Sequence, residues 1–346
     1  MANTKQKRIL LIKPKHLGDT IILTAAINSL PPEWIVDLYL LSDSVELAMP
    51  IPRVKEVFFS RKREGIFKKL AWDIQSIIRM CHHQYDAVVS LSDHPKNALL
   101  ALASGAKYRI TRHSTRRNYF WHCLFHRSIF APPGHSAVQD LAVIRGVPEL
   151  SHLQPSPYCL RPSPGPQSDE LNGPPKYVLI GAVARWKFKE IPFSVWDSVI
   201  EGIRSRGYVV YLVGDANAAP RYADLAALSD SGVHLFVGRS YDELYRLVAG
   251  ASAVLSVDSM IVHMASAARR PVAAIFGPTK PTVWGPWKTK FRVVSQSDKF
   301  PCMPCDRDGC NGSKVSECLR SLTPTIIIRE FDQLTSEFST DLLKET

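Results

Sequence analysis

Three loops of this chain carry charged and polar residues in patterns that suit proton transfer and phosphate binding. The first loop, Lys13-Pro-Lys-His-Leu-Gly18-Asp19, follows the apolar run RILLI and precedes a stretch with apolar residues at helical spacing. Its glycine permits a tight turn, and its carboxylate enters the first turn of the predicted helix. Asp19 is therefore either a general base or a residue that the helix dipole favours at a helix start.

The second loop, GAVARWKFKEIP, follows a predicted strand at 177–182. Its cations Arg185, Lys187 and Lys189 crowd the carboxyl end of that strand, where ligands bind in open α/β sheets. These side chains can contact phosphate, although exposed lysines are also common on ordinary surfaces.

The third loop lies in SVDSMIVHMASA, where a predicted strand ends at Asp258 and Ser259 to His263 form the first helical turn. Backbone N–H groups at a helix start can bind a diphosphate. His263 is either part of such a site or a buried histidine with satisfied hydrogen bonds. Four cysteines follow further along the chain, at Cys302, Cys305, Cys310 and Cys318.

The spacing of these cysteines, C-x₂-C-x₄-C-x₇-C, allows one tetrahedral zinc ion whose role would be structural, because four thiolates leave no open coordination position. The alternative is that some thiols pack beneath the loop and others pair only on oxidation.

Elements that alternate between strand and helix must position these loops. Strand-like runs at 8–13, 36–41 and 86–91 alternate with helical patterns such as 67–80. After a proline-rich stretch the pattern restarts, with predicted strands at 177–182, 208–214, 233–238, 253–258 and 271–277 and helices near 193–206, 218–229, 241–249 and 260–268. Such alternation indicates parallel sheets.

The 346 residues are too many for one ordinary core. We predict a fold of two Rossmann-like α/β domains facing across a cleft. The predicted divisions are a first domain at 1–160, a linker at 161–175, a second domain at 176–325 and a C-terminal helix or tail at 326–346.

The net charge of +11 is concentrated at 53–127, which holds 15 Lys and Arg against 5 Asp and Glu. A positive field attracts nucleic acid, an anionic membrane or a phosphorylated acceptor, or it is merely a solvated surface. No apolar run is long enough to span a membrane and no signal peptide is evident, so we expect a cytoplasmic protein.

The loop motifs together resemble a known family. The segment from Lys13 to Asp19, the pattern K-x-x-P-x-x-x-W from Lys189 to Trp196, the VDS-x-x-x-H segment and FGPT at 276–279 resemble the heptosyltransferases of glycosyltransferase family 9 in order and spacing. The cysteine-rich segment is most similar to the branch that adds the third heptose of the lipopolysaccharide inner core.

This resemblance implies two facing Rossmann-like domains of the GT-B type, with the acceptor bound by the domain at 1–160 and the nucleotide sugar by the domain at 176–325. It also implies ADP-heptose as donor and metal-independent inverting transfer. Asp19 matches the family's proposed base. The donor-binding residues that we assign are Lys189, Arg185, Asp258, Ser259, Met260, Ile261, His263, Arg239 and Asp215. Of these, Arg239 is assigned because its planar guanidinium can stack on adenine, and Asp215 is the nearest candidate for the ribose carboxylate.

Acceptor binding is assigned to basic residues that would face a lipid-anchored core oligosaccharide bearing phosphate or acidic sugar. They are Lys13, Arg61, Lys62, Arg63, Arg112, Arg116 and Arg117. The lipid anchor implies peripheral contact with the cytoplasmic face of the inner membrane. The sequence departs from the family at Ile191, where relatives often have Trp, and at Met260, where a small residue is usual.

Other readings of the chain are a transferase for a different nucleotide sugar, a dinucleotide-dependent oxidoreductase and a nucleic-acid-binding protein. The oxidoreductase is disfavoured because no G-x-G-x-x-G joins the first strand to its helix. A nucleic-acid reader is disfavoured because no helix-turn-helix or aromatic-lined pattern is evident. We therefore expect a nucleotide-sugar transferase that needs no cofactor for catalysis.

Overall fold

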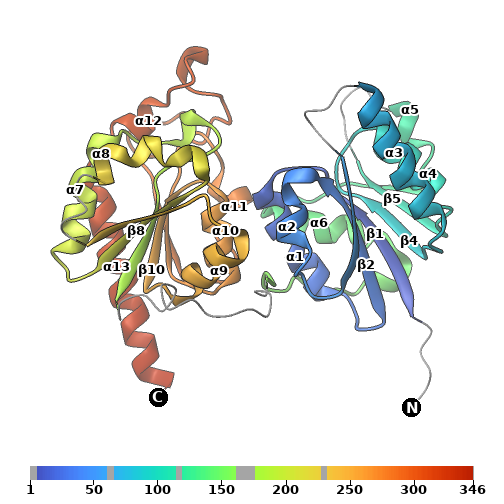
Figure 1. The fold of residues 1–346 in the computed structure, drawn as a ribbon, viewed down its shortest axis with the longest axis horizontal. Coiled ribbons are helices and arrows are strands. Elements are labelled where there is room, and N and C mark those ends of the chain that lie inside the picture. Colours follow the sequence, from blue (N-terminus) through green and yellow to red (C-terminus); the bar gives the residue numbers. More distant parts are fainter. Residues whose placement is uncertain (1–5, 61–65, 114–118, 161–175, 227–231, 346) are drawn as a thin grey trace. The chain divides into compact units, whose positions relative to one another are not determined.

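A computed structural model of the chain describes residues 6–60, 66–113, 119–160, 176–226 and 232–345. The chain divides into two compact units, Met1–Arg161 and Pro162–Thr346, each with one six-stranded sheet (Figure 1). All strand pairs within the described ranges are parallel. The prediction of two Rossmann-like domains is confirmed, whereas the predicted linker at 161–175 lies outside the described residues.

The sheet of unit 1 has the strand order β3-β2-β1-β4-β5-β6. Its strands are β1 (Lys7–Ile12), β2 (Trp34–Leu41), β3 (Val54–Ser60), β4 (Ala87–Ser90), β5 (Tyr108–Arg112) and β6 (Arg127–Ile129). Its helices are α1 (Leu17–Ser29), α2 (Val45–Ala48), α3 (Ile66–Cys81), α4 (Pro95–Ala103), α5 (Tyr119–His122) and α6 (Ser136–Ile144). Helices α1 and α6 pack together on one face of the sheet, and α3 and α4 pack together on the other (Figure 1).

The sheet of unit 2 has the order β12-β11-β10-β7-β8-β9. Its strands are β7 (Tyr177–Gly181), β8 (Val209–Gly214), β9 (Val233–Val237), β10 (Ala253–Val257), β11 (Val272–Ile275) and β12 (Phe291–Val294). Its helices are α7 (Phe193–Arg204), α8 (Ala223–Ala226), α9 (Tyr241–Gly250), α10 (Met260–Ala267), α11 (Pro281–Trp284), α12 (Glu317–Arg320) and α13 (Pro324–Glu345). Helices α7 and α13 cover one face, and α9 and α10 cover the other (Figure 1).

The central strands are apolar along their whole length because helices cover both of their faces. Ile9 to Ile12 of β1 and Ala253 to Val257 of β10 are all fully buried. Helix α13, which contains most of the segment predicted as a C-terminal helix or tail, adds Ile327, Phe331 and Leu334 to the core of unit 2.

Each sheet reverses its strand order at its first strand, which fixes where a ligand can bind. In unit 1, β1 lies between β2 and β4, and in unit 2, β7 lies between β8 and β10. Ligands of such sheets bind beyond the carboxyl ends of the strands at this switch point. The loops that follow β1, β7 and β10 are the three that carry the predicted chemistry.

One local prediction differs from the structure. In place of the start of the helix expected near 218–229 are two 3₁₀ turns, at Ala216–Ala218 and Pro220–Tyr222, which α8 follows; the predicted residues after 226 lie outside the described residues. Pro220 has no N–H to donate, which interrupts a regular helix there.

Among the helices that the structure describes, none is both long enough and apolar enough to cross a membrane.

Candidate active site

Asp19 lies in the first turn of α1, directly after the switch-point strand of unit 1. Its side chain is 13% exposed, and its Oδ1 atom is buried and accepts no hydrogen bond from the described residues. The nearest cation is the ammonium of Lys13, whose Nζ lies 3.7 Å from Oδ1. A carboxylate with an unfilled lone pair near a ligand-binding edge can accept a proton.

Lys13 follows β1 and points into unit 1. Its side chain is 1% exposed, and its Nζ donates to Oδ2 of Asp140 in α6 at 2.5 Å. An ammonium buried in this way is not presented to solvent, which argues against the direct acceptor contact predicted from the sequence. The sequence analysis did not identify Asp140 as the partner of Lys13.

Lys15 and Arg112 complete the charged surroundings of Asp19. Burial lowers the pKa of the Lys15 ammonium, and the negative charge of Asp19 opposes that effect. The guanidinium of Arg112, at the end of β5, donates to Gln139 of α6 at 2.5 Å. The remaining predicted acceptor-binding residues, Arg61, Lys62, Arg63, Arg116 and Arg117, lie outside the described residues.

In unit 2, the loops after β7 and β10 meet through an ion pair. Lys189 ends a 3₁₀ turn at Lys187–Lys189, and its Nζ donates to Oδ2 of Asp258 at 2.7 Å. The hydroxyl of Thr279, from the FGPT segment, donates to the same oxygen at 2.6 Å. Sequence analysis did not assign Thr279, although its place in the FGPT motif is a signal that marks it. Three separate loops thus converge on one buried carboxylate.

The start of α10 lies beside this carboxylate. Ser259 is the N-cap residue and not part of the first helical turn, which corrects the prediction that the helix includes it: its extended backbone lets its hydroxyl accept from the N–H of Ile261 at 3.3 Å. Met260 is half-buried, whereas Ile261 and His263 are buried. The structure therefore brings Lys189, Asp258 and the N-terminus of α10 together at the switch point.

Three other predicted donor residues lie on more open surfaces of unit 2. Arg185 is exposed, with its guanidinium 5.5 Å from the ring centroid of Trp186. Arg239, after β9, lies at a similar distance from Phe236. Asp215 is exposed and accepts from the N–H of Asn217 at 2.9 Å, so it already caps the turn that follows β8.

The cysteine-rich segment forms hydrogen bonds with the loops that follow β7 and β11. Ser316 donates to the carbonyl of Phe188 at 2.6 Å, and the N–H of Asp306 donates to the carbonyl of Pro278 at 2.7 Å. Burial, followed by the nearby sulfurs of Cys310, Cys305 and Cys302, raises the pKa of the Cys318 thiol to about 11. No three of these four described sulfurs lie within 4.8 Å of one another, so their arrangement does not match a closed zinc site.

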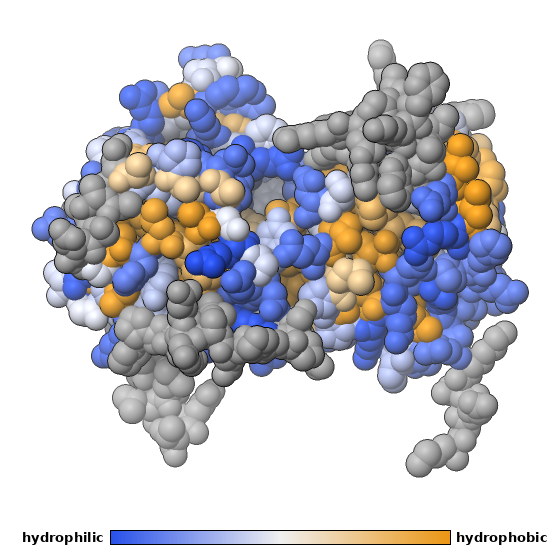
Figure 2. All heavy atoms as spheres, viewed as in Figure 1, coloured by the Kyte–Doolittle hydropathy of each residue, from blue (hydrophilic) through white to orange (hydrophobic). Residues whose placement is uncertain are grey.

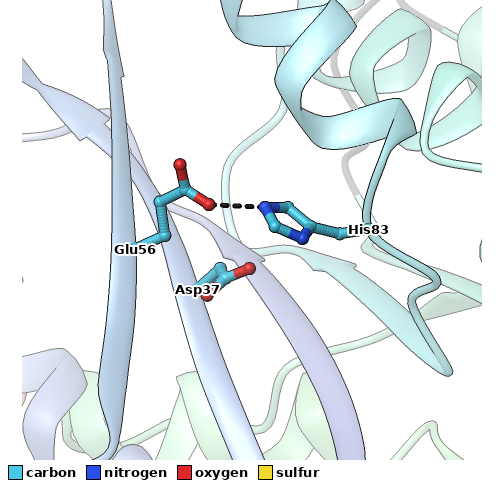
Figure 3. Close-up of side chains that lie close together, drawn as sticks. All are labelled: Asp37, Glu56 and His83. Carbon is cyan, nitrogen blue, oxygen red and sulfur yellow. Dashed lines mark hydrogen bonds and ion pairs between the residues drawn. The ribbon is translucent and has the colours of Figure 1, made fainter.

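One group of three potential metal ligands within 4.8 Å occurs in the part of the chain that the structure describes. It comprises Asp37 of β2, Glu56 of β3 and His83, which follows α3 (Figure 3). Asp37 already accepts from Arg8 at 2.7 and 3.1 Å and from the hydroxyl of Tyr85 at 2.8 Å.

Glu56 accepts from Arg79 and contacts His83. Each of the two carboxylates is therefore already paired with an arginine. Arg8 and Asp37 lie in the first halves of β1 and β2, so this network is near the amino ends of these strands, whereas Asp19 lies beyond the carboxyl end of β1. The network ties strands together and does not belong to the candidate active site.

Comparisons with known proteins agree with this geometry. A family profile described as glycosyltransferase family 9 (heptosyltransferase) matches residues 75–316. Lipopolysaccharide heptosyltransferase 3 of Escherichia coli is 25% identical over 291 residues, which cover 79% of this chain and 84% of that protein.

Two solved structures share the fold. ADP-heptose LPS heptosyltransferase II of E. coli has a TM-score of 0.75 at 19% identity and covers 96% of this chain and 99% of its own. A glycosyl transferase family 9 protein of Veillonella parvula has a TM-score of 0.77 at 14% identity, with coverage of 96% and 97%. At these identities the two likenesses establish the fold, which is that of the GT-B heptosyltransferases.

Proposed function

The chain belongs to glycosyltransferase family 9 (heptosyltransferase), and on that premise we propose that it moves a heptose from ADP-heptose to the lipopolysaccharide inner core with inversion. The observation that carries the proposal is the convergence of Lys189, Asp258 and Thr279 at the switch point of unit 2. These residues come from three family motifs and lie where open α/β sheets bind nucleotides. The name of the E. coli relative of the same fold supports ADP-heptose as donor.

The proposed reaction is a single displacement. A hydroxyl of the acceptor loses its proton to the carboxylate of Asp19 while its oxygen attacks the anomeric carbon of the donor. The bond from that carbon to the diphosphate oxygen breaks on the opposite side, and ADP leaves with the bonding pair. Inversion follows from the single attack.

Negative charge that develops on the leaving diphosphate needs preorganised cations and N–H donors. Lys189, Arg185 and the backbone at the start of α10 would supply them, so that catalysis needs no divalent ion. We assign the donor ribose to Asp215 and the adenine to Arg239. Both assignments rest on the position of these residues after β8 and β9.

We assign the chain to the branch that adds the third inner-core heptose, on the basis of its likeness to lipopolysaccharide heptosyltransferase 3. The test is to incubate the purified protein with a panel of nucleotide sugars and with core acceptors that carry one, two or three heptoses, and to measure product masses. Addition of one heptose to the acceptor with two heptoses is expected. Transfer from a hexose donor alone would contradict the heptose assignment, and transfer to another acceptor would contradict only the branch.

Contact with the inner membrane is supported by an apolar surface on unit 1. Ile74 and Ile78 of α3 are 48% and 54% exposed, and Leu99 and Leu102 of α4 are 49% and 47% exposed. Each pair lies three or four residues apart on one helix, so each pair shares a helix face. Helices α3 and α4 pack together, and we call their four exposed apolar side chains the α3–α4 face.

Hydrophobic spheres gather over these helices in the right half of Figure 2. The surrounding segment 53–127 carries ten more basic than acidic residues. Apolar side chains within a basic region suit an anionic bilayer, which attracts the cations and accepts the side chains at its interface. An acceptor with a lipid anchor would hold the protein at that surface.

The double variant Ile74→Glu/Ile78→Glu should bind vesicles that contain anionic phosphatidylglycerol roughly tenfold or more weakly, because two apolar anchors become repelled charges. Co-sedimentation at fixed salt measures the change. The matched control is Leu235→Glu/Phe291→Glu, which alters two exposed apolar residues of unit 2. Equal losses in the two double variants, or no vesicle binding by the unaltered chain, would contradict a role for the α3–α4 face.

Structural zinc at Cys302, Cys305, Cys310 and Cys318 stays a prediction of the sequence. Binding would require the segment to draw its sulfurs together and to release the proton of Cys318. If zinc binds, elemental analysis of protein purified without chelator or affinity metal should find about one ion per chain. A content well below that value would mean that the thiols pack without metal.

A further inference from the structure

Lys13 and Asp140 form a fully buried ion pair beside the proposed base. Each side chain is 1% exposed, and Nζ of Lys13 lies 2.5 Å from Oδ2 of Asp140. The two residues are 127 positions apart and meet because α6 packs against α1, the helix that follows Lys13. A buried ammonium requires a close anionic partner, and Asp140 is that partner.

The ammonium of Lys13 has a second carboxylate within reach, that of Asp19. The distance from Nζ to Oδ1 of Asp19 is 3.7 Å, which is beyond hydrogen-bonding range. Oδ1 is buried and accepts no hydrogen bond from the described residues. Lys13 is therefore close enough to act on Asp19 by its charge, yet it leaves that oxygen unbonded.

Other charged and titratable groups face this cluster from each neighbouring element. Lys15 comes from the loop before α1, and its ammonium interacts with Asp19, Lys13 and Asp140. Arg112 of β5 is held by Gln139, the residue before Asp140. Burial, followed by the negative charge of Asp140, raises the pKa of the Tyr158 hydroxyl. The hydroxyl of Tyr158 thus stays protonated at neutral pH, and among these groups the two acids, the two lysines and Arg112 carry the charge.

We propose that Asp140 is a positioning residue for Asp19: it holds the Lys13 ammonium away from the Asp19 carboxylate, so that a lone pair of Asp19 stays open to the acceptor proton. The proposal rests on the proposed function of Asp19 as the base. It gives Lys13 an electrostatic role within unit 1 in place of a direct acceptor contact. Neither residue touches the substrate in this role.

Removal of the charge of Asp140 and removal of the charge of Lys13 have opposite effects on the Asp19 carboxylate. Without the charge of Asp140, the ammonium closes on Asp19 and a nearby negative charge is lost, and both changes favour ionised Asp19. The base then accepts a proton less readily during the reaction. Without the charge of Lys13, two carboxylates remain close together, and their repulsion favours protonated Asp19.

The test compares pH profiles of kcat/KM for the purified full chain with the variants Asp140→Asn, Lys13→Met and the double variant, using ADP-heptose and a core acceptor. The acidic limb of this profile reports the pKa of the essential base in the free enzyme. For Asp140→Asn the limb should move to lower pH by about one unit, and the plateau should fall roughly tenfold. For Lys13→Met the limb should move to higher pH, and in the double variant it should return toward that of the unaltered chain.

Asp140→Glu keeps the charge and should keep the limb in place. If Asp140→Asn lowers the plateau but leaves the limb unmoved, Asp140 serves folding alone and the inference is wrong. If Asp140→Asn fails to fold, an unmoved limb in Lys13→Met overturns it equally. Asp19→Asn separates the two claims, because near-normal turnover in that variant contradicts the proposed base itself, whereas an inactive Asp19→Asn beside an unmoved limb contradicts only the role of Asp140.

Discussion

Asp19→Asn should fold, bind ADP-heptose as the unaltered chain does, and turn over roughly 10²-fold or more slowly. The carboxamide keeps the shape of the side chain but cannot accept a proton, and loss of a general base typically costs 10²-fold to 10⁴-fold in rate. Donor affinity should persist because the proposed donor residues Lys189, Asp258 and Thr279 belong to the other unit. Single-turnover kinetics and calorimetry with ADP measure the two quantities separately.

Asp19 also lies where a helix dipole favours a negative charge, so its removal should cost about 0.3–1 kcal/mol of stability. Asp242→Asn is the matched control, since Asp242 occupies the first turn of α9 and has no proposed part in proton transfer. The control should lose a similar amount of stability and keep its turnover. Turnover of Asp19→Asn near that of the unaltered chain would mean that Asp19 only starts the helix.

Most of the strands that the sequence predicts are buried on both faces, and the exception is β9, an edge strand with an exposed Leu235. Runs such as YVLIG at β7 and AVLSV at β10 are apolar throughout because helices cover both sides of each strand. The sequence analysis did not predict β3, β5, β6 and β12. Their segments VKEVFFS, YRITR, RSI and FRVV mix charged and apolar residues, or are very short, since they lie at or near the edges of the sheets.

The meeting of the loops after β7 and β10, which carry proposed donor residues, was predictable for a related reason. Each follows a strand with a clear signal, and the switch-point rule then places Lys189 and Asp258 together without any knowledge of their contact. The hydrogen bond from Thr279 adds a third loop, which follows β11, the strand beside β10. Local sequence thus predicts which loops meet but not which atoms pair.

The pair of Lys13 and Asp140 could not be predicted from the sequence. Asp140 lies in SAVQDLAVI, where a single acidic residue in an amphipathic helix normally faces solvent. Asp140 is buried because α6 packs against α1, and its partner Lys13 lies 127 residues earlier in the sequence. Only the tertiary structure shows that a residue with an ordinary helical context neutralises a lysine beside the proposed base.

Lys189→Met should weaken ADP binding by roughly tenfold to a hundredfold, because a charge-assisted hydrogen bond to phosphate is worth about 1.5–3 kcal/mol. The methionine keeps most of the lysine stem, so the turn at Lys187–Lys189 should persist. kcat/KM should fall at least as far as affinity, since the phosphate contact acts in the ground state and the transition state alike. Isothermal calorimetry with ADP measures the affinity directly.

Lys189 also neutralises Asp258, so a second substitution at Asp258 provides the control. Lys189→Met leaves the 6% exposed carboxylate of Asp258 with the Thr279 hydroxyl but without its cation, which by itself destabilises unit 2. In the double variant Lys189→Met/Asp258→Asn, the buried charge is gone, so stability should recover while ADP affinity stays low. Recovery of both would mean that Lys189 only neutralises Asp258. Lys187→Met, in the same turn and exposed, should change neither quantity, and an unchanged ADP affinity in Lys189→Met would remove Lys189 from the donor site.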